Sequence, residues 1–227
     1  MAYDPIHQVV VLYGGLVADR AEGDPGADTW TWDGSDWTEA DPGPGAPGKR
    51  EGASMVTAAD RVILFGGHLA NVGYWADAWT WDGRAWSRID KDPTPPGRGN
   101  AALAWNSSDA SLWVFGGTGF NASAGPGAQG VPLSDAWSLI GTVWNRHTGS
   151  GPPALAFANV MRDAGSNRLI VFLGMPCPNP SADAWAWDGK AWSKLPNPGI
   201  PARWGAASAQ APDGKALLFG GSNEKGC

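Results

Sequence analysis

A short apolar segment that ends in an aromatic residue and two small residues recurs five times along the chain. The copies span residues 9–15, 62–67, 112–117, 169–174 and 216–221. Each run of bulky apolar residues predicts a buried strand, and the paired glycines allow the backbone to turn or to approach a neighbour where no Cβ fits. Leu173 occupies the first glycine position of the fourth copy, so a glycine is not required in every copy.

A second segment follows each of the first four copies, beginning with Asp and ending with Trp nine residues later. These segments are residues 28–37, 77–86, 135–144 and 183–192. Tryptophans at alternate positions place two indoles on one face of a strand. An Asp-Gly pair, as in Asp33-Gly34, then predicts a hairpin turn, although the third copy has Ile140-Gly141 instead. Since 11 of the 15 tryptophans lie in these segments, the tryptophan content belongs to the repeat and is not an aromatic binding stripe.

The connection from the second glycine position to the next Asp varies between repeats, at 13, 10, 18 and 9 residues. The remaining connection, from the last Trp to the next glycine position, holds at 28 to 30 residues. A loop that varies on a constant frame is typical of a functional face. Each unit therefore consists of a starting strand, such as 47–54, the apolar strand, the Asp-x-Trp strand and a final Trp strand.

Composition excludes several classes of protein. The chain has 15 Trp and only 17% charged residues, whereas disordered chains have few aromatic and many charged residues. Its formal net charge of -6 provides no basic surface for nucleic acid or anionic membranes. No apolar stretch approaches the ~18 residues of a membrane span. We therefore expect one all-β domain over residues 1–227, with neither a nucleic-acid nor a membrane partner.

The order of these elements resembles the kelch repeat, and most closely the bacterial kelch propellers related to the central domain of galactose oxidase. The resemblance implies an all-β, kelch-type β-propeller of four-stranded antiparallel blades, here five with the fifth incomplete. The corresponding units span approximately 1–46, 47–95, 96–151, 152–199 and 200–227. Such propellers usually have six or seven blades. The chain is therefore either a small propeller of five blades, monomeric if the ring closes, or a piece of a longer polypeptide, or a chain that self-associates because it needs a second copy to close the ring. We favour the five-bladed interpretation, because an open sheet edge promotes aggregation.

The variable loops supply the first binding candidates. In a four-stranded meander the loops after the second and fourth strands share one end of the sheet, so loops 16–27, 68–76, 118–134 and 175–182 line one rim. The candidates on this rim are His68, Tyr74, Trp75, Phe120 and Asn121. A recognition surface at the channel mouth would use them. The alternative is that these loops vary because the fold tolerates it, without a binding role, and that Phe120 and Trp75 pack onto their own blades.

Three arginines and one tryptophan complete the binding candidates. Arg50, Arg98 and Arg203 each open a first strand, and Trp204 follows the last of them. The resemblance to kelch adaptors implies arginines that hold acidic partners through bidentate hydrogen bonds. The alternative, which we favour, is an inter-blade clamp to a carbonyl or to a repeat aspartate. For the repeat aspartates, Asp28, Asp77, Asp135 and Asp183, we expect a structural role accepting backbone N–H bonds.

No arrangement of residues points to catalysis, a metal or a cofactor. His7, His68 and His147 have no partner at metal-ligand spacing. The tyrosines and cysteines do not match a galactose-oxidase copper site, and neither GxSxG, P-loop nor HExxH motifs occur. Cys177 and Cys227 lie on the same rim in neighbouring blades, so they form either a disulfide, which implies an oxidising compartment, or two unrelated thiols.

We therefore interpret the chain as a non-catalytic binding module that holds a protein, peptide or glycan on its rim. One alternative is a kelch-type enzyme, such as a carbohydrate isomerase or a metal-assisted lyase, with its site at the channel mouth. Another is a structural fragment of a larger extracellular protein. Residues 1–5 have neither the basic nor the apolar region of a secretory signal, while the family resemblance favours an extracytoplasmic or secreted location.

Overall fold

The computed structural model describes residues 1–16, 25–70, 72–91, 93–120, 130–163, 165–197, 199–210 and 215–225. Within these residues the chain is all-β and contains no helix, as predicted. Each of the first four units forms one four-stranded antiparallel sheet, and unit 5 contributes a two-stranded sheet. The repeat therefore corresponds to one sheet.

The strands of each unit follow the predicted order of apolar strand, Asp-x-Trp strand and final Trp strand. Unit 1 contains β1 (Ala2–Asp4), β2 (Val9–Leu16), β3 (Pro25–Trp32) and β4 (Trp37–Ala40). Unit 2 contains β5 (Ser54–Ala58), β6 (Arg61–Phe65), β9 (Ala78–Trp81) and β10 (Trp86–Arg88). Unit 3 contains β12 (Ala102–Asn106), β13 (Ser111–Phe115), β16 (Ala136–Ile140) and β17 (Val143–His147). Unit 4 contains β18 (Asn159–Asp163), β19 (Arg168–Phe172), β20 (Ala184–Trp187) and β21 (Trp192–Leu195), and unit 5 contains β22 (Ala207–Gln210) and β23 (Ala216–Phe219).

The first strand of unit 2 lies further along the chain than predicted. We expected it at residues 47–54, but β5 begins at Ser54, and residues 54–58 pair with the apolar strand β6. The arginine segments are separate from the four-stranded sheets. Beside Arg50, Glu51 forms an isolated bridge with His68, and in unit 3 the short strand β11 (Arg98–Gly99) pairs with β14 (Thr118–Gly119). The sequence prediction had merged two elements because both follow the same Pro/Gly-rich linker.

The predicted hairpin turns are present after the Asp-x-Trp strands. Asp33 Oδ1 accepts hydrogen bonds from the backbone N–H groups of Ser35 and Asp36, and Gly34 has a φ of +102°. Asp82 and Asp188 accept the equivalent bonds in units 2 and 4. An aspartate at this position therefore stabilises the turn by mimicking a backbone acceptor.

Consecutive sheets pack face to face through one repeated aromatic contact. The last aromatic residue of the apolar strand in one unit lies against the final Trp of the next unit. The pairs are Tyr13–Trp86 at 5.3 Å, Phe65–Trp144 at 5.3 Å and Phe115–Trp192 at 5.1 Å between ring centroids. Four clusters of buried apolar residues extend these contacts along the series of units. The core therefore lies between sheets and not within a single sheet.

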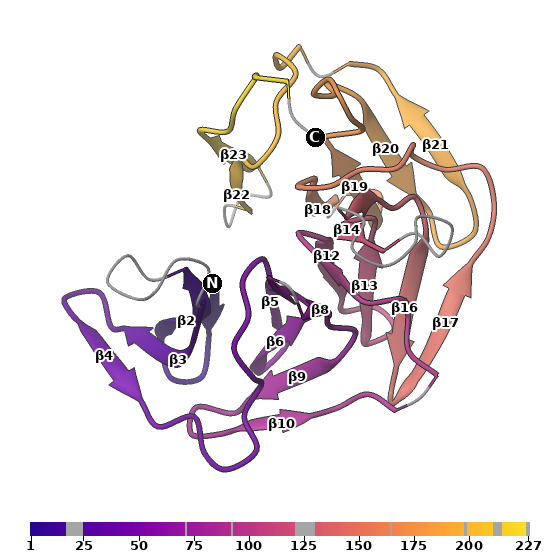
Figure 1. Ribbon diagram of the computed structural model, residues 1–227. Helices are drawn as coiled ribbons and strands as arrows, with labels where there is room; N and C mark the ends of the chain where they lie inside the picture. Colours follow the sequence, from indigo (N-terminus) through magenta and orange to yellow (C-terminus); the bar gives the residue numbers. More distant parts are fainter. Residues whose placement is uncertain are drawn as a thin grey trace.

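The first strands of the five units lie next to one another. β1 contacts β5, β5 contacts β12, β12 contacts β18 and β18 contacts β22. Figure 1 shows the sheets following one another in chain order around a common centre, with the indigo unit 1 and the yellow pair β22 and β23 at the two ends of the series. A cavity of about 890 Å³, lined mainly by these first strands, lies at this centre.

The paired glycines approach the neighbouring unit closely. Gly67 N–H donates to the carbonyl oxygen of Arg98 over 2.9 Å, and a Cβ on Gly66 would lie 2.3 Å from the same oxygen. Leu173 takes the equivalent position in unit 4 with a φ of +61° and is fully buried. A side chain is therefore accommodated at that junction, although the equivalent glycine at Gly66 has no room for one.

Candidate binding surface at one end of the sheets

Three of the predicted rim residues form one aromatic cluster, which we call the rim cluster: His68, Tyr74 and Phe120. His68 and Tyr74 lie opposite each other on the short strands β7 (His68–Leu69) and β8 (Gly73–Tyr74), and their rings stack at 5.2 Å. The ring of Phe120, from the loop of unit 3, meets Tyr74 edge-on at 5.0 Å. The structure thus brings together aromatic residues from the variable loops of two neighbouring units.

The side chain of Tyr74 also packs closely against the loop of unit 3. A Cβ on Gly130, next to β15 (Val131–Pro132), would lie 2.0 Å from Tyr74 Oη, so this position has no room for a side chain.

Burial, followed by the negative charge of Glu51, raises the pKa of Tyr74 above its ordinary value. The phenol therefore remains protonated at neutral pH and can donate a hydrogen bond.

A carboxylate borders the rim cluster. Glu51 and His68 exchange two backbone hydrogen bonds of 2.9 and 2.8 Å, and Glu51 Oε1 lies 3.4 Å from His68 Nε2. His68 Nδ1 is buried and has no hydrogen-bond partner among the described residues. The sequence prediction did not include Glu51. The position of Glu51 directly after the candidate Arg50 could have suggested it as a site residue. Only its bridge to His68 shows that it reaches the cluster.

The exposure of the cluster decreases from its surface inward. Phe120 is 48% exposed, whereas the side chains of His68 and Glu51 are 26% and 21% exposed. An exposed ring held by a supporting ring, with a carboxylate and an imidazole beside it, provides both an apolar face and polar groups for a ligand.

The arginine candidates Arg50 and Arg98 lie in the interior and hold parts of their own units together. Arg98 is fully buried and donates to Pro96 O at 3.1 Å, to Gly116 O at 2.9 Å and to both oxygens of Asp135 at 2.6 and 2.9 Å. Arg50 makes the equivalent bonds to Gly48 O, to Gly66 O and to both oxygens of Asp77. The partners are those of the clamp interpretation, a carbonyl and a repeat aspartate, but they belong to the arginine's own unit, so the expected clamp between blades was wrong. These contacts also leave little of either guanidinium for an external partner.

We expected the repeat aspartates to accept hydrogen bonds from backbone N–H groups. In the structure, side chains such as those of arginine and tryptophan donate to them instead. Asp77 and Asp135 each pair with an arginine and accept the indole N–H of the Trp two residues later, at 2.7 Å in both units. Burial acts to raise the pKa of Asp77 and of Asp135, but the hydrogen bonds and charge of the arginine outweigh it, and both pKa values lie below the ordinary value. The guanidinium, with its fork of donors, satisfies a buried carboxylate better than a single N–H does.

Units 1 and 4 depart from this arrangement. In unit 4, Leu155 takes the place of the arginine. The carbonyl of Leu155 accepts the N–H of Gly117, just as the carbonyl of Arg98 accepts the N–H of Gly67. Asp183 pairs there with Lys194 at 2.9 Å. In unit 1, Asp28 Oδ2 accepts the indole N–H of Trp30 at 2.7 Å.

The remaining candidates lie apart from the rim cluster or outside the described residues. Trp75 is half-buried, with the Arg50 guanidinium 5.7 Å from its ring centroid. Trp204 packs on Phe157 at 5.1 Å and donates its indole N–H to Glu224 O. Arg203 donates only to backbone carbonyls among the described residues.

Two other predicted features reach residues that the structure does not describe. Asn121 lies outside the described residues. Cys177 is disulfide-bonded, but Cys227 is also outside them, so the proposed Cys177–Cys227 bridge stays a prediction.

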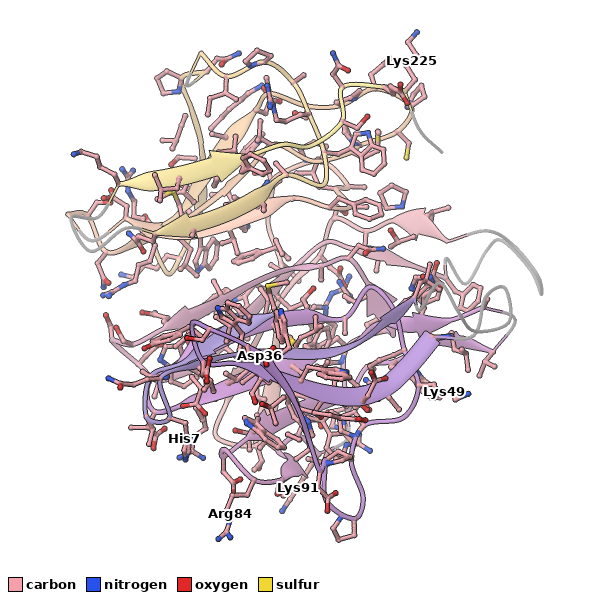
Figure 2. The ribbon with its side chains drawn as sticks, turned by 90° about the vertical axis from the view of Figure 1, so that its left-hand side faces the viewer. His7, Asp36, Lys49, Arg84, Lys91 and Lys225 are labelled. Carbon is pink, nitrogen blue, oxygen red and sulfur yellow. The ribbon has the colours of Figure 1, made fainter. Side chains whose placement is uncertain are left out.

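The other two histidines lie away from the rim cluster. His7 Nδ1 lies 2.8 Å from Asp4 Oδ2, and a Cβ on Gly83 would lie 2.1 Å from the His7 ring. In Figure 2, His7 and Arg84 lie toward the left-hand side of the molecule, whereas Lys49, which precedes Arg50, lies toward the right. His147 stacks on Trp113 at 4.3 Å, and burial lowers its pKa.

Neither metal-binding groups nor membrane-spanning helices occur in the described ranges. No group of three or more His, Cys, Asp or Glu residues in this part of the chain could hold a metal ion. No helix in the same residues is long and apolar enough to cross a membrane. No protein-family model matches the sequence, and no curated protein matches it. The kelch assignment therefore remains a resemblance carried by the repeats.

Proposed function

We propose that this chain forms a kelch-type β-propeller of five units, the fifth with two strands among the described residues, and that its rim cluster binds a protein, peptide or glycan without catalysing a reaction. The propeller arrangement is supported by the order of the sheets around a common cavity and by the repeated aromatic contact between consecutive units. Sheets that repeat radially in this way leave their loops gathered at the ends of the central space.

One observation carries the binding role. The Phe120 ring is 48% exposed and meets Tyr74 edge-on, and Tyr74 is itself stacked on His68. A preorganised aromatic ring loses little conformational freedom when a ligand covers it, and this favours binding. Glu51 and His68 beside it supply hydrogen-bonding groups that select the orientation of the ligand.

The Glu51–His68 pair also favours a second candidate, an enzyme with general acid or base chemistry at the same place. A carboxylate 3.4 Å from an imidazole can orient the ring for proton transfer. This candidate predicts turnover of a bound ligand that is abolished in His68→Ala and retained in Phe120→Ala at saturating ligand. The binding-module proposal predicts no turnover in either protein.

A comparison of two variants on glycan and peptide arrays tests the proposal. Phe120→Ala removes the exposed ring, and Ile140→Ala is its matched control because Ile140 lies in the same unit with a similar exposed fraction of 49%. We expect the wild-type chain and Ile140→Ala to bind the same ligand class, and Phe120→Ala to bind at least tenfold more weakly. Equal binding by all three proteins, or no ligand on either array, would contradict the proposal.

A further inference from the structure

Unit 5 presents an open sheet edge where the other units have a third strand. β23 pairs only with β22 in the described part of the chain, whereas β6, β13 and β19 each pair on their other side with an Asp-x-Trp strand. An open edge carries a row of unpaired backbone N–H and C=O groups that can accept another strand. The edge of β23 therefore has the hydrogen-bonding groups for a strand of this kind.

Arg203 is already positioned for the aspartate that such a strand carries. Its Nε donates to Pro201 O at 3.2 Å and its Nη1 to Gly220 O at 2.9 Å, which reproduces the bonds of Arg98 to Pro96 O and Gly116 O. In units 2 and 3 the same guanidinium also binds the aspartate that precedes the third strand. Within the described residues, no carboxylate takes this place beside Arg203.

Phe172 of unit 4 lacks the tryptophan that its counterparts contact. Tyr13, Phe65 and Phe115 each meet the final Trp of the following unit. For Phe172 that tryptophan would belong to the fourth strand of unit 5, which is absent among the described residues. Phe172 is itself only 6% exposed, so the strand edge and the guanidinium are the two features open to the missing hairpin.

We propose that unit 5 is a docking site for a β-hairpin of the Asp-x-Trp type supplied from outside residues 1–227. The first strand of the hairpin pairs with β23, and its aspartate binds Arg203. A second copy of this chain fits less well, because its own Asp-x-Trp strands are already paired within sheets. This inference does not depend on the rim cluster.

A labelled peptide with the sequence of residues 77–90 is the probe, because it contains the Asp-x-Trp strand, the turn and the final Trp of unit 2. Binding of this peptide to the full chain is measured by fluorescence anisotropy. Arg203→Gln removes the proposed partner of the peptide aspartate, and Arg84→Gln is the matched control because it removes an equal charge from an exposed turn. Arg203 is outside the buried core, so the variant should fold, and circular dichroism checks this.

We expect saturable one-to-one binding that Arg84→Gln leaves unchanged. Arg203→Gln should weaken binding at least tenfold, and so should Asp77→Asn in the peptide. The two changes together should weaken it no more than either alone, because both remove the same contact. Hydrogen exchange of the β23 amides should slow when the peptide is bound.

Three results would overturn the proposal. They are absence of binding, equal binding by Arg203→Gln and wild type, and additive effects of the two substitutions. Concentration-dependent self-association that excludes the peptide and is lost in Phe219→Ser would also overturn it. That result would make the exposed face of β23, where Phe219 is 83% exposed, an interface between copies of this chain.

Discussion

The guanidinium of Arg98 binds both carboxylate oxygens of Asp135, at 2.6 and 2.9 Å, inside unit 3. The two residues are 37 positions apart, and the longest variable loop lies between them. The pair therefore closes that loop onto the sheet regardless of its length. Unit 2 repeats the arrangement with Arg50 and Asp77, so two loops of the rim share one kind of anchor.

Replacing Arg98 with Ala should strongly destabilise the fold. The substitution leaves Asp135 partly buried without its partner, and breaking a buried ion pair costs about 3–5 kcal/mol. Arg203→Ala is the matched control, since it removes only bonds to carbonyls near the surface and should cost about 1 kcal/mol or less. Equilibrium unfolding in urea measures both, and equal losses would contradict the proposed anchoring role.

Stability should fall at acid pH through the same ion pairs. The pKa values of Asp77 and Asp135 are lowered in the folded chain, so their contribution is fully present above the ordinary carboxyl pKa of about 3.9. It is lost as the pH falls below that value and through the lower folded-state pKa, because the folded state then binds fewer protons than the unfolded state.

The double variant Asp77→Asn/Asp135→Asn isolates this contribution from that of exposed carboxylates. We expect its free energy of unfolding at neutral pH to be lower than that of the wild type and to depend less on pH below about 4. Denaturant unfolding at a series of pH values provides the comparison. Parallel pH profiles for the two proteins would show that the buried pairs do not cause the acid dependence.

The paired glycines provide a test of the contact between units. Gly66 and Gly220 have nearly the same φ, +65° and +67°, but an added Cβ meets Arg98 O at 2.3 Å at Gly66 and meets nothing within 4 Å at Gly220. Gly220→Ala should therefore cost only the left-handed backbone conformation, about 1–2 kcal/mol. Gly66→Ala should cost more because the neighbouring unit must move. Similar unfolding midpoints for the two variants would contradict the close approach of consecutive units.

The sequence was sufficient to predict the strands and turns because both depend on local patterns. The apolar runs, the alternating tryptophans and the Asp-Gly turns each require only neighbouring residues, and these elements lie where they were expected. The first strand of unit 2 was misplaced because residues 47–53 and 54–58 follow one linker without a clear boundary. Their separation depends on pairing with His68 and with β6.

The rim cluster was only partly predictable. His68, Tyr74 and Phe120 were candidates because they lie in variable loops, but loop sequences do not specify which side chains meet. Their contacts depend on the packing of two loops from different units, including the missing side chain at Gly130. The buried arginines illustrate the converse, because their surroundings and not their residue type direct them to an internal carboxylate.

Proton NMR of the three imidazole rings is the most direct test of the rim cluster as a binding surface. His68 stacks in the cluster, whereas His7 accompanies Asp4 and His147 stacks on Trp113, so the last two serve as internal controls. The ligand is the strongest binder found on the arrays. Our account predicts that the ligand shifts the His68 ring resonances and leaves those of His7 and His147 in place. Saturating ligand that leaves His68 unshifted while another imidazole moves would contradict it.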